Sequence, residues 1–329
     1  MRGLILVVLL TAAASEFCAG QSSPRLVVVN KGENAIAIVD VQSGKVLGHA
    51  PSGEGPHEVA VSADGRTAYV SNYGSREPGH SISIIDLGSL NSRQLDLGPL
   101  RRPHGLAEFG GQVYFTVELN KLIGRYDPAA DRVDWLMGTG QNSTHMAIVS
   151  RDGARMFTAN IGSDSITVFE RPPTPAAAQN PLAWNETAIA VGKGPEGMDL
   201  SPDGRELWAA GSRDGSVSIV DVAQKKVVQT LNVQTRRSNR LKFTPDGKLV
   251  LISDLDAGEL LVLDAASRRQ VKRIPLGREV EGILIAPEGG RAYVAVSGDD
   301  NIAVVDLKTF SVVSRLQSGK GPDGMAWAK

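Results

Sequence analysis

The sequence is short of cysteine, of net charge and of long hydrophobic runs. Cys18 is the only cysteine among the 329 residues, so a Cys-x-x-Cys-His motif for covalent haem attachment is excluded. The formal net charge is -1, which argues against a nucleic-acid binder because phosphate contacts require clustered Lys and Arg. The apolar run 4–10 is too short to cross a bilayer, so it predicts no membrane span.

The run 4–10 instead predicts a secretory signal peptide. One positive charge, Arg2, precedes the run and the small residues Ala12–Ala14 follow it, as in such leaders. We expect residues 1–20 to be removed, which leaves residues 21–329 as a single domain in the periplasm or outside the cell. Because Cys18 leaves with the leader, we expect no disulfide, catalytic thiol or thiolate metal ligand in the mature protein.

Two markers recur along residues 21–329 at spacings of 41 to 51 residues, a period typical of repeats with four strands each. The first marker is a tight turn: Asp64-Gly65, Gly110-Gly111, Asp152-Gly153, Asp203-Gly204, Asp246-Gly247 and Gly289-Gly290. The second is an acid that closes a strand rich in β-branched residues: Asp40, Asp86, Asp127, Glu170, Asp221, Asp264 and Asp306. Apolar residues alternate with period two between the markers, which predicts strands rather than paired helices.

There are seven acids but only six turns, and this difference indicates how the repeat closes. Residues 25–40 supply two strands without the apolar strand and turn that open the other repeats. Residues 322–329 have the pattern of a first strand without its successors. We therefore predict an all-β fold, a seven-bladed β-propeller of four-stranded blades. It is closed by pairing of the C-terminal strand with three N-terminal strands (3+1), which leaves no open sheet edge between the ends.

Two segments depart from the repeat. Residues 171–186 contain four prolines between the third and fourth strands of one blade, which predicts a surface insertion. Residues 74–80, which end at His80, lengthen a loop on the face where the first strands begin. We expect that loop to lean over the central channel.

The repeat resembles a known family. The strand end Tyr69-Val70-Ser71-Asn72 and the turn Ser201-Pro202-Asp203-Gly204, with its counterpart Thr244-Pro245-Asp246-Gly247, resemble the YVTN/YncE-like β-propeller repeat family of the lactonase-like superfamily. The resemblance covers essentially the whole mature chain and implies the propeller fold. Relatives by architecture include lactonase-like and streptogramin-lyase-like propellers, surface-layer repeat proteins and periplasmic metal- or haem-associated propellers. Function therefore has to be argued from the site.

One polar residue opens the first strand of each repeat, and by the symmetry of the fold the seven form a ring at one mouth of the channel. These residues are His57, His104, His145, Glu196, Asn239, Glu281 and Asp323. Proline precedes four of them and glycine follows four, which holds each side chain beside the axis with little bulk around it.

The chemistry of the ring suggests a metal site. Three neutral imidazoles from adjacent blades suit zinc, copper or nickel, so His57, His104 and His145 are the expected ligands of a divalent metal. Glu196 and Glu281 are the expected catalytic acids or bases. The residues expected to contact a small-molecule ligand are Asn239, Arg240, Asp323 and His80.

Three functions remain open from the residues alone. The first is a binding propeller that holds a metal ion or a small ligand at the mouth. The second is an enzyme that uses the same ring, a metal-assisted hydrolase or lyase of the lactonase or streptogramin-lyase kind. The third is a protein-interaction scaffold without chemistry, with its protein partner on the same face, because a propeller mouth is solvated and polar in any case.

Overall fold

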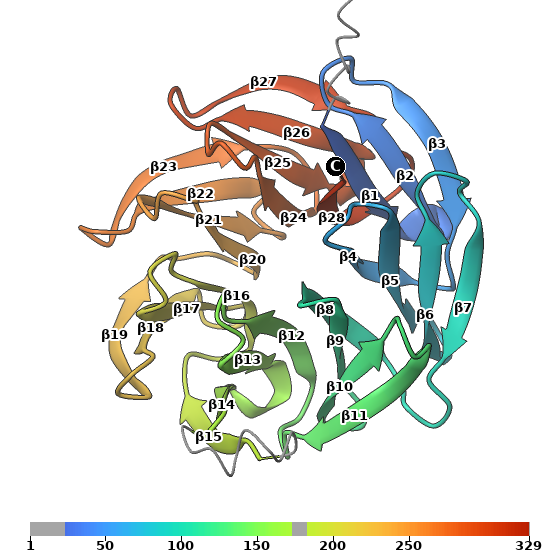
Figure 1. Ribbon diagram of the computed structural model, residues 1–329. Coiled ribbons are helices and arrows are strands. Elements are labelled where there is room, and N and C mark those ends of the chain that lie inside the picture. Colours follow the sequence, from blue (N-terminus) through green and yellow to red (C-terminus); the bar gives the residue numbers. More distant parts are fainter. Residues whose placement is uncertain (1–23, 173–182, 329) are drawn as a thin grey trace, which may run out of the picture.

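The computed structural model of the protein describes residues 24–172 and 183–328. Seven four-stranded antiparallel sheets surround a common centre (Figure 1), which confirms the predicted seven-bladed β-propeller. The predicted leader, residues 1–20 with Cys18, and residues 173–182 of the predicted insertion lie outside the described residues. Within the described part of the chain, no helix is long and apolar enough to cross a membrane.

The strands occupy the same four places in every blade. The innermost strands are β4 (Pro56–Val61), β8 (Pro103–Phe109), β12 (Thr144–Val149), β16 (Pro195–Leu200), β20 (Ser238–Phe243), β24 (Val280–Ile285) and β28 (Pro322–Ala328). The second strands are β5 (Thr67–Gly74), β9 (Gln112–Val117), β13 (Arg155–Asn160), β17 (Glu206–Gly211), β21 (Leu249–Asp254), β25 (Arg291–Val296) and β1 (Arg25–Asn30). We number the blades 1 to 7 in this order.

The outer half of each blade follows the same pattern. The third strands are β6 (Pro78–Asp86), β10 (Leu122–Asp127), β14 (Ser165–Glu170), β18 (Ser216–Asp221), β22 (Glu259–Asp264), β26 (Asn301–Asp306) and β2 (Ala35–Asp40). The outermost strands are β7 (Ser92–Asp96), β11 (Arg132–Gly138), β15 (Asn185–Ala190), β19 (Lys226–Asn232), β23 (Arg269–Pro275), β27 (Ser311–Leu316) and β3 (Val46–Pro51). Short 3-10 turns η1 (Lys31–Glu33), η2 (Ile161–Ser163) and η3 (Ser297–Asp299) follow three of the second strands.

Blade 7 joins the two ends of the chain. Its strand order is β28-β1-β2-β3, and β28 pairs antiparallel with β1, with Leu26 opposite Trp327. This pairing confirms the predicted 3+1 closure. Without β28, the inner edge of β1 would expose unpaired backbone groups toward the channel.

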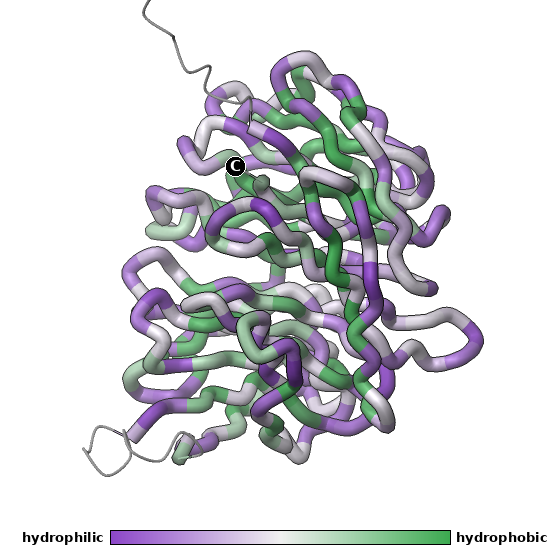
Figure 2. Tube along the Cα trace, turned by 45° about the vertical axis from the view of Figure 1, so that its right-hand side comes forward, coloured by the Kyte–Doolittle hydropathy of each residue, from purple (hydrophilic) through white to green (hydrophobic). Residues whose placement is uncertain are grey.

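Aliphatic side chains between neighbouring blades form the core. Between blades 5 and 6, for example, Leu251 and Val262 pack in one buried cluster with Val280 and Val294. Hydrophobic stretches follow the strands, whereas most loops are hydrophilic (Figure 2). Each fully buried Val or Leu contributes about 1.5–3 kcal/mol of transfer free energy, so blade-to-blade contact is the main source of stability.

Both repeat markers owe their regularity to turn chemistry. Gly65 has a φ of +73°, and its amide donates to the carbonyl of Ser62 over 2.8 Å, which closes the hairpin between the first two strands. The acid that ends the third strand binds the next turn: Asp264 Oδ1 accepts from the amide of Ser267 over 2.7 Å. Glu170 is the exception, because its longer side chain forms ion pairs with Arg155 and Lys225 instead.

Candidate functional site

The first strands bend where the seven ring residues stand. In blade 1, Pro56 pairs with Asn72 but Val59 pairs with Val70, so one extra residue is accommodated in β4. Every first strand shows such a register shift. A bulge of this kind releases residues from the ladder and re-aims their side chains, here toward the channel.

The structure brings all seven ring residues together at one mouth of the channel. They line a pocket of about 560 Å³, which we call the mouth pocket. A second group of lining residues comes from the ends of the second strands in six of the blades. Each stands one position beyond the residue that pairs with the first residue of the innermost strand. The group comprises Lys31, Tyr73, Glu118, Ile161, Ser212 and Leu255.

One side of the mouth pocket holds a group of buried histidines. The rings of His104 and His145 lie 3.7 Å apart between centroids, and His145 Nδ1 lies 2.5 Å from Glu118 Oε1. The ligand atoms of His104, Glu118 and His145 all lie within 4.8 Å of one another. We call these three residues the histidine group. Tyr73 supports it, because its hydroxyl donates to Glu118 Oε2 over 2.8 Å.

Two ring nitrogens of the histidine group lack a hydrogen-bond partner within the described part of the chain. Among the described residues, His104 Nδ1 and His145 Nε2 are buried and accept or donate no hydrogen bond. Burial, together with the nearby His145 and His57, lowers the pKa of His104 well below its usual value, so this imidazole is neutral at pH 7. Burial would raise the pKa of Glu118, but the hydrogen bond from His145 lowers it below its usual value.

The opposite side of the mouth pocket holds an acidic cluster of Glu281, Asp323, Lys31 and His57. Lys31 Nζ lies 2.5 Å from Glu281 Oε2 and 3.3 Å from Asp323 Oδ2. His57 Nδ1 lies 3.2 Å from the same oxygen of Asp323, while its ring is 5.0 Å from that of His104 between centroids. His57 therefore bridges the two sides of the pocket.

Glu281 and Asp323 share the ammonium group of Lys31, and their pKa values shift in opposite directions. Burial and the charge of Asp323 raise the pKa of Glu281 to about 8. Burial alone would raise the pKa of Asp323, but Lys31, His57 and Arg240 hold it below the usual range. The pair therefore keeps one proton at neutral pH, and Glu281 carries it.

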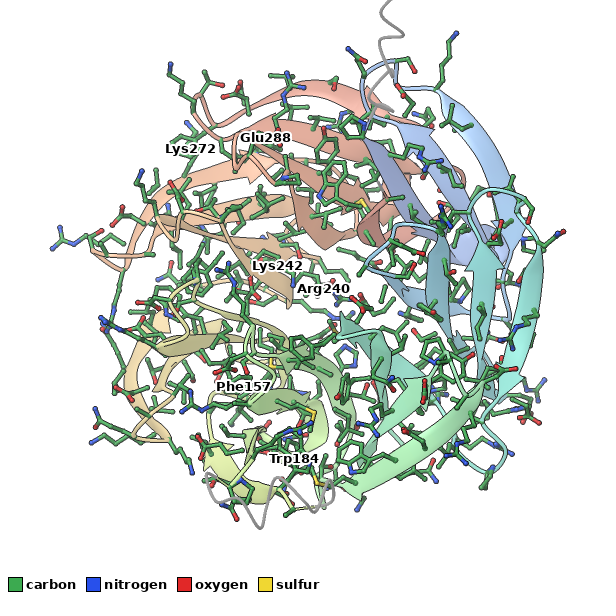
Figure 3. The ribbon with its side chains drawn as sticks, in the orientation of Figure 1. Phe157, Trp184, Arg240, Lys242, Lys272 and Glu288 are labelled. Carbon is green, nitrogen blue, oxygen red and sulfur yellow. The ribbon has the colours of Figure 1, made fainter. Side chains whose placement is uncertain are left out.

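Below the mouth pocket, an ion pair crosses the channel. Arg240 of β20 bonds through Nη2 to Glu58 Oε1 of β4, and Arg240 lies at the centre of the ring of blades (Figure 3). Its guanidinium also lies 3.7 Å from Asp323 Oδ1, and its side chain is 6% exposed. Arg240 was expected to bind a ligand, but its guanidinium already faces the carboxylates of Glu58 and Asp323.

Asn239 and Glu196, the two remaining ring residues, are joined to Arg240 by a short chain of hydrogen bonds. Arg240 Nη1 donates to Asn239 Oδ1 over 3.2 Å, and Asn239 Nδ2 donates to Glu196 Oε1 over 2.7 Å. Asn239 and Glu196 are both buried at the pocket wall. Each therefore presents its remaining polar atoms in a defined orientation.

The glycines that follow ring residues are required for a second reason, in addition to the small bulk expected from the sequence. A Cβ on Gly282 would lie 2.1 Å from the backbone oxygen of Asp323, and one on Gly105 would lie 2.6 Å from that of His145. Gly197 and Gly324 meet the backbone of the next blade in the same way. Glycine thus allows adjacent first strands to approach closely at the axis.

His80 is the one predicted site residue that the structure does not bring to the mouth. Strands β5 and β6 extend the hairpin through most of the expected loop, with Gly74 opposite Pro78. The exposed imidazole of His80 pairs with Asp96 of the outermost strand β7 over 2.9 Å. The register of β6 therefore carries His80 outward across the blade instead of over the channel.

Sequence reasoning missed Glu118 and Lys31. Both stand one position beyond the end of a second strand, the strand end at which a Tyr-Val-x-Asn pattern appears in blade 1. Alignment of that position across the repeats brings Tyr73, Glu118 and Lys31 into register. The repeat therefore carries a signal for these residues at the ends of its second strands.

The fold and the site define a seven-bladed β-propeller with a buried, histidine-containing pocket at one mouth. The family model described as "Lactonase, 7-bladed beta-propeller" matches residues 129–240, about a third of the chain. This match confirms the predicted resemblance to lactonase-like propellers. A candidate 6-phosphogluconolactonase of Bacteroides fragilis superposes with a TM-score of 0.77 at 18% identity, covering 94% of this chain and 99% of that one. At this identity the likeness concerns the fold alone.

Two curated proteins are similar over part of the sequence. Hydrazine synthase subunit beta of Kuenenia stuttgartiensis is 32% identical over 141 residues, which are 35% of this chain and 36% of that protein. Antigen Lp49 of Leptospira interrogans is 23% identical over 152 residues, 40% of this chain and 33% of the antigen. The chain thus spans about a third of the length of these relatives.

Proposed function

We propose that the protein binds a divalent transition-metal ion at the mouth of the propeller and presents it to a small ligand in the mouth pocket. The observation that carries the proposal is the pair of buried, unpartnered ring nitrogens on His104 and His145 beside the carboxylate of Glu118. A buried polar atom without a hydrogen bond costs about 1–3 kcal/mol, which a bound cation at this point would offset.

The donor set favours zinc, copper or nickel. Two imidazoles and a carboxylate are the usual ligands of an open zinc site that keeps one position for water or a ligand. Glu118 also orients His145, because it faces Nδ1 and leaves Nε2 free for coordination. His57, the third expected ligand, lies at the edge of the site with its Nδ1 on Asp323.

The test is metal binding by protein purified without a histidine tag, measured by elemental analysis and by calorimetric titration with zinc, copper and nickel. We expect one ion per chain. His104→Ala and His145→Ala should each weaken binding by about 100-fold or more, and Glu118→Gln by about 10–100-fold.

His80→Ala is the matched control, because it removes an imidazole that is outside the mouth pocket. It should leave metal affinity unchanged. Titrations without saturable binding of any of the three ions, or an equal loss in the His80→Ala protein, would refute the metal site and favour an inert scaffold.

A second candidate, a metal-assisted hydrolase or lyase, is favoured by the lactonase family match and by the protonated Glu281 in the same pocket. In that function, Glu281 would donate a proton to a leaving group while the metal polarised a carbonyl. Turnover of a lactone and ester panel that disappears in Glu281→Gln or Glu196→Gln, with metal binding retained, would distinguish the enzyme from the binding protein.

A further inference from the structure

Two arginines stand at the rim of the mouth pocket on neighbouring blades. Arg213 follows β17 of blade 4, Arg237 precedes β20 of blade 5, and both exposed side chains line the pocket. The nearest carboxylate oxygen to Arg213, on Asp164, is 4.0 Å away, at the limit of an ion pair. Among the described residues, the guanidinium of Arg237 has neither a hydrogen bond nor a salt bridge within the chain, so its charge is not neutralised there.

The backbone holds Arg237 firmly in place. Its amide donates to Asp254 Oδ1 over 2.9 Å, and its carbonyl accepts from the amide of Leu255 over 2.9 Å. The guanidinium therefore extends from a fixed backbone, so ligand binding has to order only the side chain. Arg236 has a similar backbone bond to Asp254 Oδ2 but does not line the pocket.

None of the described carboxylates that line the mouth pocket forms an ion pair with Arg213 or Arg237, and each has a hydrogen-bond or ion-pair partner inside the pocket. Glu118 bonds to His145 and Tyr73, and Glu196 accepts from Asn239. Glu281 and Asp323 share Lys31. The rim arginines are thus the charges of this pocket that remain available to an incoming group.

We propose that the ligand of the mouth pocket is a small organic carboxylate, gripped by Arg213 and Arg237 at the rim while its other end reaches the histidine group. Guanidinium groups bind carboxylates through paired, charge-assisted hydrogen bonds. A pocket of about 560 Å³ is in the size range of small-molecule sites. The inner anchor of the ligand rests on the metal site proposed above, whereas the grip of the arginines does not.

The experiment is calorimetric titration with succinate and glutarate, with succinamide as the uncharged probe and inorganic phosphate as the alternative anion. It is run on zinc-loaded protein and on protein stripped with a chelator. We expect saturable dicarboxylate binding, weakened about tenfold by Arg213→Gln or by Arg237→Gln and further by the double variant. Raising the salt concentration should weaken binding, because these charges are exposed.

Arg236→Gln is the control, since it removes a neighbouring exposed guanidinium that does not line the pocket. It should change affinity by less than about twofold. Arginine-dependent binding that persists in stripped protein supports the carboxylate site even if zinc does not bind, so the two proposals fail separately. Equal binding of succinamide, binding of phosphate alone, or an equal loss in Arg236→Gln would overturn the proposal.

Discussion

At the scale of single residues, the main feature of the mouth is an imbalance of charge in the acidic cluster. Lys31 is one cation between two buried carboxylates, and water cannot screen their repulsion effectively at this depth. The cluster resolves the repulsion by keeping a proton on Glu281, whose pKa is raised to about 8. This protonated carboxyl is a potential hydrogen-bond donor toward a ligand in the mouth pocket.

Glu281 should make stability depend on pH. Between its ordinary pKa of 4.5 and about 8, the folded state keeps a proton that the unfolded chain has lost. The free energy of unfolding therefore falls as pH rises through this window, by up to about 1.4 kcal/mol per pH unit, and levels off above it. Glu281→Gln should remove this slope. Urea unfolding at pH 5, 6, 7 and 8 measures the difference.

The exposed carboxyl of Glu288 provides the comparison for that series. Glu288→Gln should leave the pH dependence of the wild type unchanged. Parallel stability curves for wild type and Glu281→Gln would show that Glu281 ionises normally in the folded protein.

At the scale of single elements, each first strand combines a bulge, an inward polar residue and, in four blades, a glycine. The bulge turns the polar residue toward the axis, and the glycine lets the next first strand come close. Where glycine is replaced by Glu58 or Arg240, the side chain enters the channel instead. At this position of the repeat, glycine allows close strand packing, Glu58 and Arg240 place a charge at the axis, and Met146 of blade 3 packs against an apolar cluster.

Gly282→Ala should destabilise the protein by about 1–3 kcal/mol, because its Cβ would lie 2.1 Å from the backbone oxygen of Asp323. Thermal and urea unfolding measure the loss. Gly138→Ala is the matched control: an added Cβ there has no neighbour within 4 Å, and the change should stay within about 0.5 kcal/mol. Similar losses in both variants would mean that the approach of the two strands is not tight.

At the scale of the whole molecule, the ring of blades is held at two places besides its blade interfaces. The pairing of β28 with β1 closes the circle on the inner side of blade 7. The ion pair between Glu58 and Arg240 connects blades 1 and 5 across the axis, between residues 182 positions apart in the sequence. It also forms a charged floor below the mouth pocket.

Breaking that ion pair on one side should cost about 3–5 kcal/mol, since the remaining charge stays buried. We expect this loss for Arg240→Met and a smaller one for Glu58→Gln, because Asp323 stays 3.7 Å from the guanidinium. The loss in the double variant should be smaller than the sum of the two. A double-mutant cycle in urea measures the coupling. The exposed pair of Arg93 and Asp131 is the reference, and Asp131→Asn should cost less than about 1 kcal/mol. Additive losses in the cycle would argue against a direct pair across the channel.

The number of blades, their order and their closure were all predictable from the sequence. Alternation of apolar residues and the chemistry of turns such as Asp203-Gly204 act over a few residues, so each repeat displays them separately. The same regularity placed seven polar residues at one mouth, because equivalent positions of equivalent strands must meet at the axis. Which residues stand at the mouth was therefore a property of the repeat.

Only the tertiary structure decided which of those residues touch. His57 contacts Asp323 through Nδ1 while its ring stays beside that of His104, Glu118 joins His104 and His145, and Arg240 is occupied by Glu58. These contacts depend on the width of the channel and on side chains that cross it between segments distant in the chain. Distances of 3 to 5 Å between side chains of different blades are set by how the seven sheets pack together, and no local sequence pattern encodes them. The repeat thus determines where the pocket is, and the packing of the blades determines its chemistry.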